Sequence, residues 1–157
     1  MTLSLPDQFG RERTLSFPQP TLSVLTVADH KGSEEITAWV QSLKGQLGVE
    51  LPIEGVADVS RVPRLLRPLV RKRFSEKVNH PVLLDWEGGV VSQLRCQPNT
   101  ANVFLLSTNG EVLLTLHGAV DVLKLEQLQD AVREAQRPEP KALDVSVRST
   151  SLSEQGR

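Results

Sequence analysis

Residues 22–47 have the sequence LSVLTVADHKGSEEITAWVQSLKGQL, which predicts a buried strand that turns directly into an amphipathic helix. The first seven residues are mostly apolar or β-branched, as in a central, parallel strand that is covered on both faces. Ser33 is a residue type favoured at helix N-termini, and the two glutamates after it suit the positive end of the helix dipole. Apolar side chains then recur at helical spacing at Ile36, Trp39, Val40, Leu43 and Leu47.

The segments around this unit extend it into an α/β chain. Two short apolar pieces flank Asp7-Gln8-Phe9-Gly10, whose aspartate and glycine favour a turn, so we expect an N-terminal hairpin over residues 3–17. Residues 52–57 and 81–86 are apolar runs of strand length. They predict two further strands of the same sheet.

The C-terminal half predicts a second hairpin and a last helix. The turn Asn109-Gly110 lies between two apolar runs and indicates a hairpin over residues 102–116. Asp121 is suited to cap a helix over residues 122–135, where apolar side chains again recur at helical spacing. Beyond this helix, prolines and a Ser/Thr-rich stretch have little capacity to form a core. We therefore expect one domain over residues 1–136 and a flexible tail over residues 137–157.

The segment over residues 61–78 predicts a helix that a proline interrupts. Pro63 suits the first helical turn, where its missing N–H is harmless. Pro68 is expected to kink the helix or to divide it, because an interior proline removes a hydrogen bond and clashes with the preceding turn. One apolar face is expected to carry Val62, Leu65, Leu66, Leu69, Val70 and Phe74.

The order of these segments resembles the thioredoxin-like superfamily, and specifically its redoxin branch of peroxiredoxins and thiol–disulfide oxidoreductases. The resemblance covers roughly residues 5–136 and is carried by the motif Asp7-Gln8-Phe9-Gly10, by residues 22–47 and by residues 103–110. It implies an α/β fold of three layers, α/β/α, with a central mixed sheet and an N-terminal β-hairpin.

The resemblance fails at the two places where the family has its redox chemistry. In the family, the turn after the first core strand holds reactive cysteines, because a helix N-terminus lowers the pKa of a thiol. Here that turn is His30-Lys31-Gly32-Ser33. The family also has a cis-proline before the late strand, and if Phe104 matches the usual aromatic residue there, Ala101 occupies the proline position. The sequence therefore predicts a degenerate active site.

The only cysteine, Cys96, is the one candidate for thiol chemistry. It follows Arg95 in the approach to the late strand, a loop that in the family faces the active-site turn. A reactive thiol needs exposure and a lowered pKa, whereas a free cysteine is more often a small buried hydrophobic residue. The alternative to a structural role is a one-cysteine redox enzyme, a peroxidase or oxidoreductase, that uses Cys96.

No other cluster predicts catalysis or a metal. His30, with Asp29 and Ser33, is better explained as part of a capped, solvated turn than as a nucleophile and its base. His80 and His117 are isolated, and none of the three histidines has a neighbour at metal-ligand spacing. We expect neither a metal nor another cofactor.

The helical segment after the second strand is strongly basic. Seven cations lie within seventeen residues, against Glu76 alone. A solvated helix face is the ordinary explanation, and an anionic partner is the functional one. A protein partner, with an acidic surface as one form, is preferred; anionic lipid is a further option, and nucleic acid is disfavoured because aromatic residues for base stacking are absent. The candidate partner-binding residues are Arg61, Arg64, Arg67, Arg71, Lys72, Arg73 and Lys77.

Composition agrees with an ordinary globular domain. The chain has 157 residues, a net charge of −1, 39% hydrophobic and 24% charged residues. These values exclude a global attraction to nucleic acid or anionic lipid. A transmembrane run and a signal peptide are not predicted, and a single cysteine suits a reducing compartment, so a cytoplasmic location is expected. The sequence favours a non-catalytic thioredoxin-like protein that acts as a binding or accessory module.

Overall fold

The structure is a computed structural model that describes residues 2–46 and 51–138. The strands are β1 (Leu3–Pro6), β2 (Glu12–Leu15), β3 (Ser23–Ala28), β4 (Ile53–Asp58), β5 (Leu83–Asp85), β6 (Asn102–Leu106) and β7 (Val112–His117). The helices are α1 (Ser33–Gln46), a 3-10 turn η1 (Arg64–Leu66), α2 (Arg67–Lys77), α3 (Gly89–Gln93) and α4 (Val122–Gln136). No helix in these described ranges is long and apolar enough to cross a membrane.

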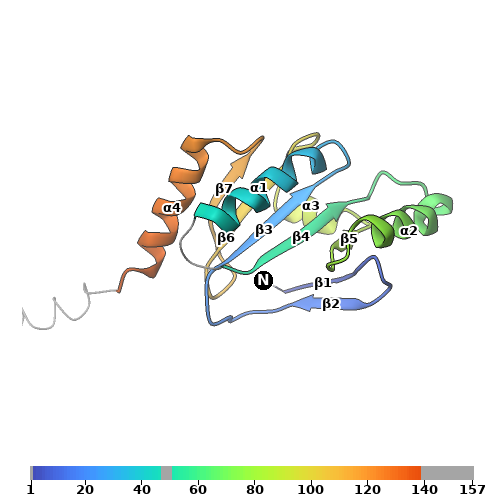
Figure 1. Ribbon diagram of the computed structural model, residues 1–157. Helices are drawn as coiled ribbons and strands as arrows, with labels where there is room; N and C mark the ends of the chain where they lie inside the picture. The colour runs from blue at the N-terminus through green and yellow to red at the C-terminus, as the bar shows by residue number, and fades with distance from the viewer. Residues whose placement is uncertain (1, 47–50, 139–157) are drawn as a thin grey trace, which may run out of the picture.

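A five-stranded mixed sheet forms the centre of the molecule (Figure 1). Its strand order is β5-β4-β3-β6-β7, with β3, β4 and β5 parallel and with β6 and β7 antiparallel to their neighbours. All six residues of β3 are buried, as expected for a central strand with both faces covered. The first core strand is therefore parallel and central, as its composition predicted.

Two different layers cover the two faces of the sheet. On one face, α1 and α4 pack against the sheet through Trp39 and Leu128, both of which are fully buried. The Trp39 Nε1 also donates a hydrogen bond of 2.8 Å to the carbonyl oxygen of Gly118, which joins α1 to the connection between β7 and α4. On the other face, the β1–β2 hairpin and α3 pack through Leu3 and Val90. The result is the predicted three-layer α/β/α arrangement with an N-terminal hairpin.

The buried side chain of Gln8 attaches the tip of this hairpin to the rest of the domain. Its amide nitrogen donates to the carbonyl oxygens of Val78 (3.1 Å) and His80 (2.7 Å), and its oxygen accepts from the backbone N–H of Val82 (2.8 Å). These three bonds satisfy the polar groups of a buried amide. They fix the hairpin against the connection that leads from α2 into β5.

The local predictions are confirmed at Pro68, at the Asp121 cap and at the Asn109-Gly110 turn. Pro68 divides the helical segment, since η1 ends at Leu66 and Pro68 lies in the first turn of α2. Asp121 caps α4, because its carboxylate accepts a hydrogen bond of 2.7 Å from the backbone N–H of Lys124. Gly110 has a φ of +84° in the β6–β7 turn, which a glycine adopts without strain. The predicted tail, from residue 139 onward, lies outside the described residues.

The predicted apolar face of residues 61–78 is wrong in part. Val62, Val70 and Phe74 pack on the edge of the sheet as expected. Leu65, Leu66 and Leu69 instead point away from the core, with exposed fractions of 95%, 47% and 48%. The physical reason is the position of α2 beside β5, the three-residue edge strand, which offers too little apolar surface to cover both stripes of the helix.

Truncation of Leu128 tests how much the α4 layer contributes to stability. Leu128 is completely buried between α4 and the sheet, so Leu128→Ala is expected to lower the free energy of unfolding by about 2–5 kcal/mol. Leu123→Ala, on the same helix but 66% exposed, is expected to change it by less than about 0.5 kcal/mol. Urea unfolding followed by circular dichroism measures both. Equal effects of the two variants would contradict the packing described here.

Candidate functional site

The turn between β3 and α1 is stabilised by its own hydrogen bonds. The Asp29 Oδ1 accepts from the backbone N–H of Gly32 (2.8 Å), and the Ser33 N–H donates to the Asp29 carbonyl oxygen (2.9 Å). The Ser33 hydroxyl donates to the carbonyl oxygen of His30 (2.6 Å) and does not accept from a helix N–H. Asp29, not the predicted Ser33, is therefore the side-chain acceptor at the start of this helix.

The loop before β6, residues 94–101, is joined to this turn by hydrogen bonds. The second oxygen of Asp29 accepts from the backbone N–H of Asn99 (2.7 Å). The Oε1 of Glu35, in the first turn of α1, accepts from the Ala101 N–H (3.0 Å) and the Thr100 hydroxyl (2.9 Å). Two carboxylates thus accept hydrogen bonds from the backbone N–H groups on both sides of Thr100. The sequence predicted that this loop faces the turn but did not predict what joins them.

The packing between turn and loop leaves no space at Gly32. A Cβ atom on this buried glycine would lie 2.3 Å from the Thr100 carbonyl oxygen, closer than real Cβ contacts. The two backbones therefore touch directly. We conclude that the turn is closed at the position where a side chain would otherwise point toward the loop.

A buried asparagine, which the sequence analysis missed, fixes the rest of this loop. The amide nitrogen of Asn102 lies within 3.3 Å of the carbonyl oxygens of Val27, Gln97 and Thr100. Its oxygen accepts from the Gln97 N–H (2.8 Å) and lies 2.8 Å from the Nδ1 of His117. Because the amide nitrogen faces three carbonyls, the oxygen is the acceptor and the proton is on His117 Nδ1. The sequence did contain a signal that could have identified Asn102, because it is a polar residue at the start of an otherwise apolar strand.

Cys96 lies behind the loop and not at the turn. Its side chain is half-buried against the core under the hairpin, and its N–H donates to the Val91 carbonyl oxygen (3.0 Å). Burial, and then the negative charges of Asp58 and Asp85, raise the pKa of the Cys96 thiol to about 12. At neutral pH the thiolate, which is the nucleophilic form, is scarcely populated.

The histidines do not form a metal site. Within the described residues there is no group of three or more His, Cys, Asp or Glu side chains that could hold a metal ion. His30 and His80 are exposed, and His117 is bonded to Asn102.

The seven predicted partner-binding cations are divided by the fold into one structural residue and six exposed ones. The guanidinium of Arg67 lies over the Trp86 ring, 5.1 Å from its centroid, and pairs with Glu87 at 3.2 Å. Arg67 therefore holds α2 against the end of β5. The other six are exposed and form no ion pair with any residue that the structure describes; they are Arg61, Arg64, Arg71, Lys72, Arg73 and Lys77.

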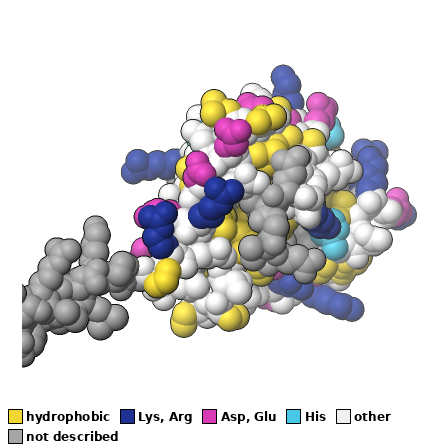
Figure 2. All heavy atoms as spheres, turned by 60° about the vertical axis from the view of Figure 1, so that its left-hand side comes forward, with side chains coloured by type: hydrophobic (Ala, Val, Ile, Leu, Met, Phe, Trp, Pro, Cys, Tyr) yellow, Lys and Arg dark blue, Asp and Glu magenta, His cyan; other side chains and the backbone are white. Residues whose placement is uncertain are grey.

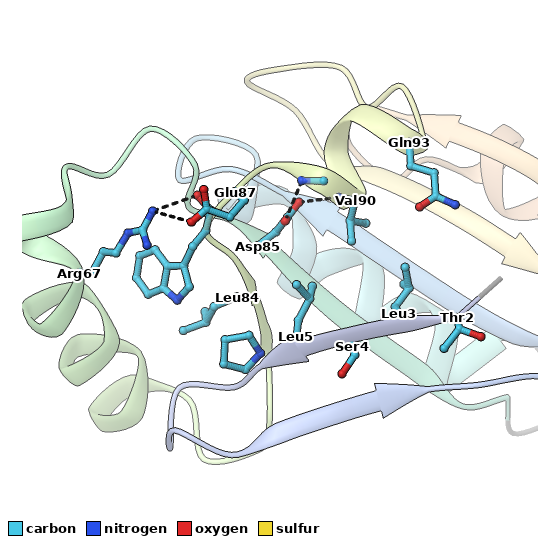
Figure 3. Close-up of a pocket in the computed structure, with 13 residues that line it drawn as sticks. Thr2, Leu3, Ser4, Leu5, Arg67, Leu84, Asp85, Glu87, Val90 and Gln93 are labelled. Carbon is cyan, nitrogen blue, oxygen red and sulfur yellow. Dashed lines mark hydrogen bonds and ion pairs between the residues drawn. The ribbon is translucent and has the colours of Figure 1, made fainter.

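A pocket of about 400 Å³ lies between β1, the end of β5 and α3 (Figure 3). Its walls include Leu3, Leu5, Leu84 and Arg67, but no cysteine or histidine. Asp85 is not free for chemistry there, because its two oxygens accept three backbone N–H groups at the start of α3, at 3.0–3.1 Å. The pocket thus has no thiol or imidazole in its lining and shares no residue with the turn before α1.

Solved structures establish the fold class. The pneumococcal exposed lipoprotein thioredoxin Etrx1 from Streptococcus pneumoniae superimposes with a TM-score of 0.64 at 13% identity, over 83% of this chain and 98% of that one. Yeast Sco1 gives 0.60 at 15% identity (88% and 96%), and the peroxidoxin BcpB from Mycobacterium tuberculosis gives 0.55 at 16% identity (87% and 95%). No protein-family model matches the sequence, and no curated protein matches it. The chain has the thioredoxin-like fold.

Adding a methyl group at Gly32 tests the contact between turn and loop. Gly32→Ala places an atom against the Thr100 carbonyl and is expected to cost about 1–3 kcal/mol of stability. The matched control is Gly45→Ala in α1, where a Cβ meets nothing within 4 Å and alanine is favoured by about 0.5–1 kcal/mol. Thermal unfolding compares the two. A neutral Gly32→Ala would show that the loop is not packed on the turn.

The reactivity of Cys96 tests its surroundings. With a pKa of about 12, the native thiol is expected to react with iodoacetamide at pH 7 roughly a thousandfold more slowly than the unfolded chain. Burial favours the neutral thiol, so the native rate is expected to rise about tenfold per pH unit well beyond pH 9. Mass spectrometry of the alkylated protein measures both rates. A midpoint below that of the unfolded chain would contradict the environment described above.

Proposed function

We propose that this chain, whose fold is thioredoxin-like, is a non-catalytic binding or accessory module. One observation carries the proposal. The turn that would hold reactive cysteines has none, and hydrogen bonds hold it against the loop before β6. Asp29 and Glu35 supply the carboxylates, and Gly32 lies in contact with Thr100. A thiol–disulfide or peroxide reaction needs an accessible thiolate at this helix N-terminus.

The electrostatics of the turn support the same proposal. A helix N-terminus stabilises an anion, and here Glu34, Glu35 and Asp29 already supply negative charge to it. The backbone N–H groups of Asn99 and Ala101 are bonded to carboxylates and so are not available to an extended substrate. The positions that would favour a thiolate and orient its substrate are thus occupied by groups of the protein itself.

The properties of Cys96 weigh against the one-cysteine enzyme. Its thiol is held neutral by burial and by two nearby carboxylates. A nucleophilic cysteine requires the opposite, a site with positive charge that lowers the pKa. Cys96 is better explained as part of the core under the hairpin, which it contacts.

The binding surface of the proposed module is the basic segment over residues 61–77. Its six exposed cations have no carboxylate partner within the described chain, so their charge is available to an anionic partner. In contrast, on the α4 side acidic and basic side chains are interspersed (Figure 2). Arg133 pairs there with Asp130, and Arg137 pairs with Glu134. Within the described residues, the basic segment is where most cations without an ion pair gather.

Activity assays on the purified protein test this proposal. The protein is expected to reduce insulin disulfides with dithiothreitol, and to consume hydrogen peroxide, no faster than the reagents alone, because it lacks an accessible thiolate. Cys96→Ser, which removes the only thiol, is expected to give the same rates. Turnover above background that disappears in Cys96→Ser would assign the one-cysteine enzyme instead.

A further inference from the structure

The tip of the molecule, residues 61–73, consists of η1, the residues just before it and the first two turns of α2, and it carries exposed leucines. In Figure 1, α2 lies at the right-hand end of the molecule, beside the edge strand β5. Leu65 is 95% exposed, Leu66 47% and Leu69 48%, and neither η1 nor α2 contains a fully buried residue. Large aliphatic side chains gathered at one surface site mark an interaction surface more often than chance exposure.

These leucines are not needed to hold α2 in place. Val70 and Phe74, four residues apart and so on one helix face, pack on the sheet edge. Arg67 lies beside them over Trp86. Leu69 directly precedes Val70 and so lies about 100° away from it around the helix, on a different stripe, and Leu65 and Leu66 belong to η1, before α2 begins. The core contact and the exposed leucines are therefore separate features of the same segment.

The leucine tip is surrounded by unpaired cations. Arg61 and Arg64 precede Leu65, and Lys72 and Arg73 follow Leu69 by three and four residues, about one helical turn. All four are exposed and have no ion pair within the described residues. Apolar side chains and cations that are placed together in this way complement a surface that is anionic outside and apolar beneath.

We propose that the tip over residues 61–73 binds the surface of an anionic lipid bilayer, with Leu65, Leu66 and Leu69 inserted among the headgroups. The inference rests on the proposed function, for which it names the partner. In such contacts leucines enter the boundary between headgroups and acyl chains, and Lys and Arg side chains contact the lipid phosphates. The side chains at this tip are of both kinds.

The chemistry of the tip favours lipid over the other two anionic partners. Nucleic acid would use the cations but would gain nothing from the leucines, and the tip has no aromatic residue on which a base could stack. Interfaces with proteins are enriched in tyrosine, tryptophan and arginine around a central pocket. Here the apolar residues are leucines at the end of the molecule, and none of these leucines lines the pocket on this side.

Sedimentation with vesicles tests the proposal on the full chain. One set of vesicles is phosphatidylcholine; in the other, about a third of the lipid is phosphatidylglycerol. Binding is expected only to the anionic vesicles and is expected to weaken as salt is added. Leu65→Ser is expected to lower the partition coefficient at least tenfold, and Lys72→Gln about fivefold.

The controls are matched substitutions on α4. Leu123→Ser replaces a leucine that is 66% exposed, and Arg133→Gln replaces an exposed cation. Both are expected to change vesicle binding less than twofold. Since Leu65 and Lys72 are exposed, their substitution leaves the core intact, which circular dichroism verifies.

Three outcomes would overturn the proposal. They are failure to bind the anionic vesicles, binding that Leu65→Ser leaves unchanged, and stronger binding to duplex DNA or to poly-glutamate than to the vesicles. The last would assign the surface to nucleic acid or to an acidic protein. None of these outcomes bears on the thiol assays, so failure of the lipid partner and failure of the non-catalytic proposal are distinguishable.

Discussion

The candidate site depends on one constraint, the hydrogen bonds that the carboxylates of Asp29 and Glu35 accept from the loop before β6. They join the turn after β3 and the first turn of α1 to a segment about seventy residues later in the chain. Because Gly32 has no side chain, the two backbones touch, and the carboxylates satisfy N–H groups that would otherwise face solvent or a substrate. Asn102 holds the same loop from its other side through three polar contacts, with Gln97 and Thr100, and it also contacts Val27 and His117. The turn after β3, the loop before β6 and the start of β6 thus form one hydrogen-bonded unit.

In the same fold, most cations of the basic segment over residues 61–77 have no acidic side chain paired with them within the described residues. The whole chain has a net charge of −1, yet residues 61–77 contain seven cations and one anion. Arg67 is used to hold α2 on Trp86, and the remaining cations surround leucines that the short β5 edge does not cover. Clustered like charges lower the stability of a free protein through repulsion, and exposed apolar surface lowers its solubility. A complementary partner that covers them relieves both effects. This is why we assign binding to α2 and not to α4.

Much of the fold could be predicted from local patterns. The strand and helix of residues 22–46, the two hairpins and the division of the helical segment at Pro68 all follow from periodicity, turn residues or proline chemistry, which act over a few residues. The apolar face of residues 61–78 was predicted incorrectly, because periodicity identifies apolar stripes but does not show which stripe a neighbour covers. Leu65 and Val70 are equally apolar in the sequence and differ only in what lies beside them.

The sequence by itself determined the fold class, the absence of a cysteine from the turn after β3 and the basic character of residues 61–77, since each depends only on which residues are present and in what order. The tertiary structure decided the rest. It brought Glu35 to Ala101, placed Cys96 where burial and carboxylates keep its thiol neutral, and left Leu65 exposed. Such contacts join residues far apart in the chain, and their energy depends on distance and burial, which no local pattern specifies.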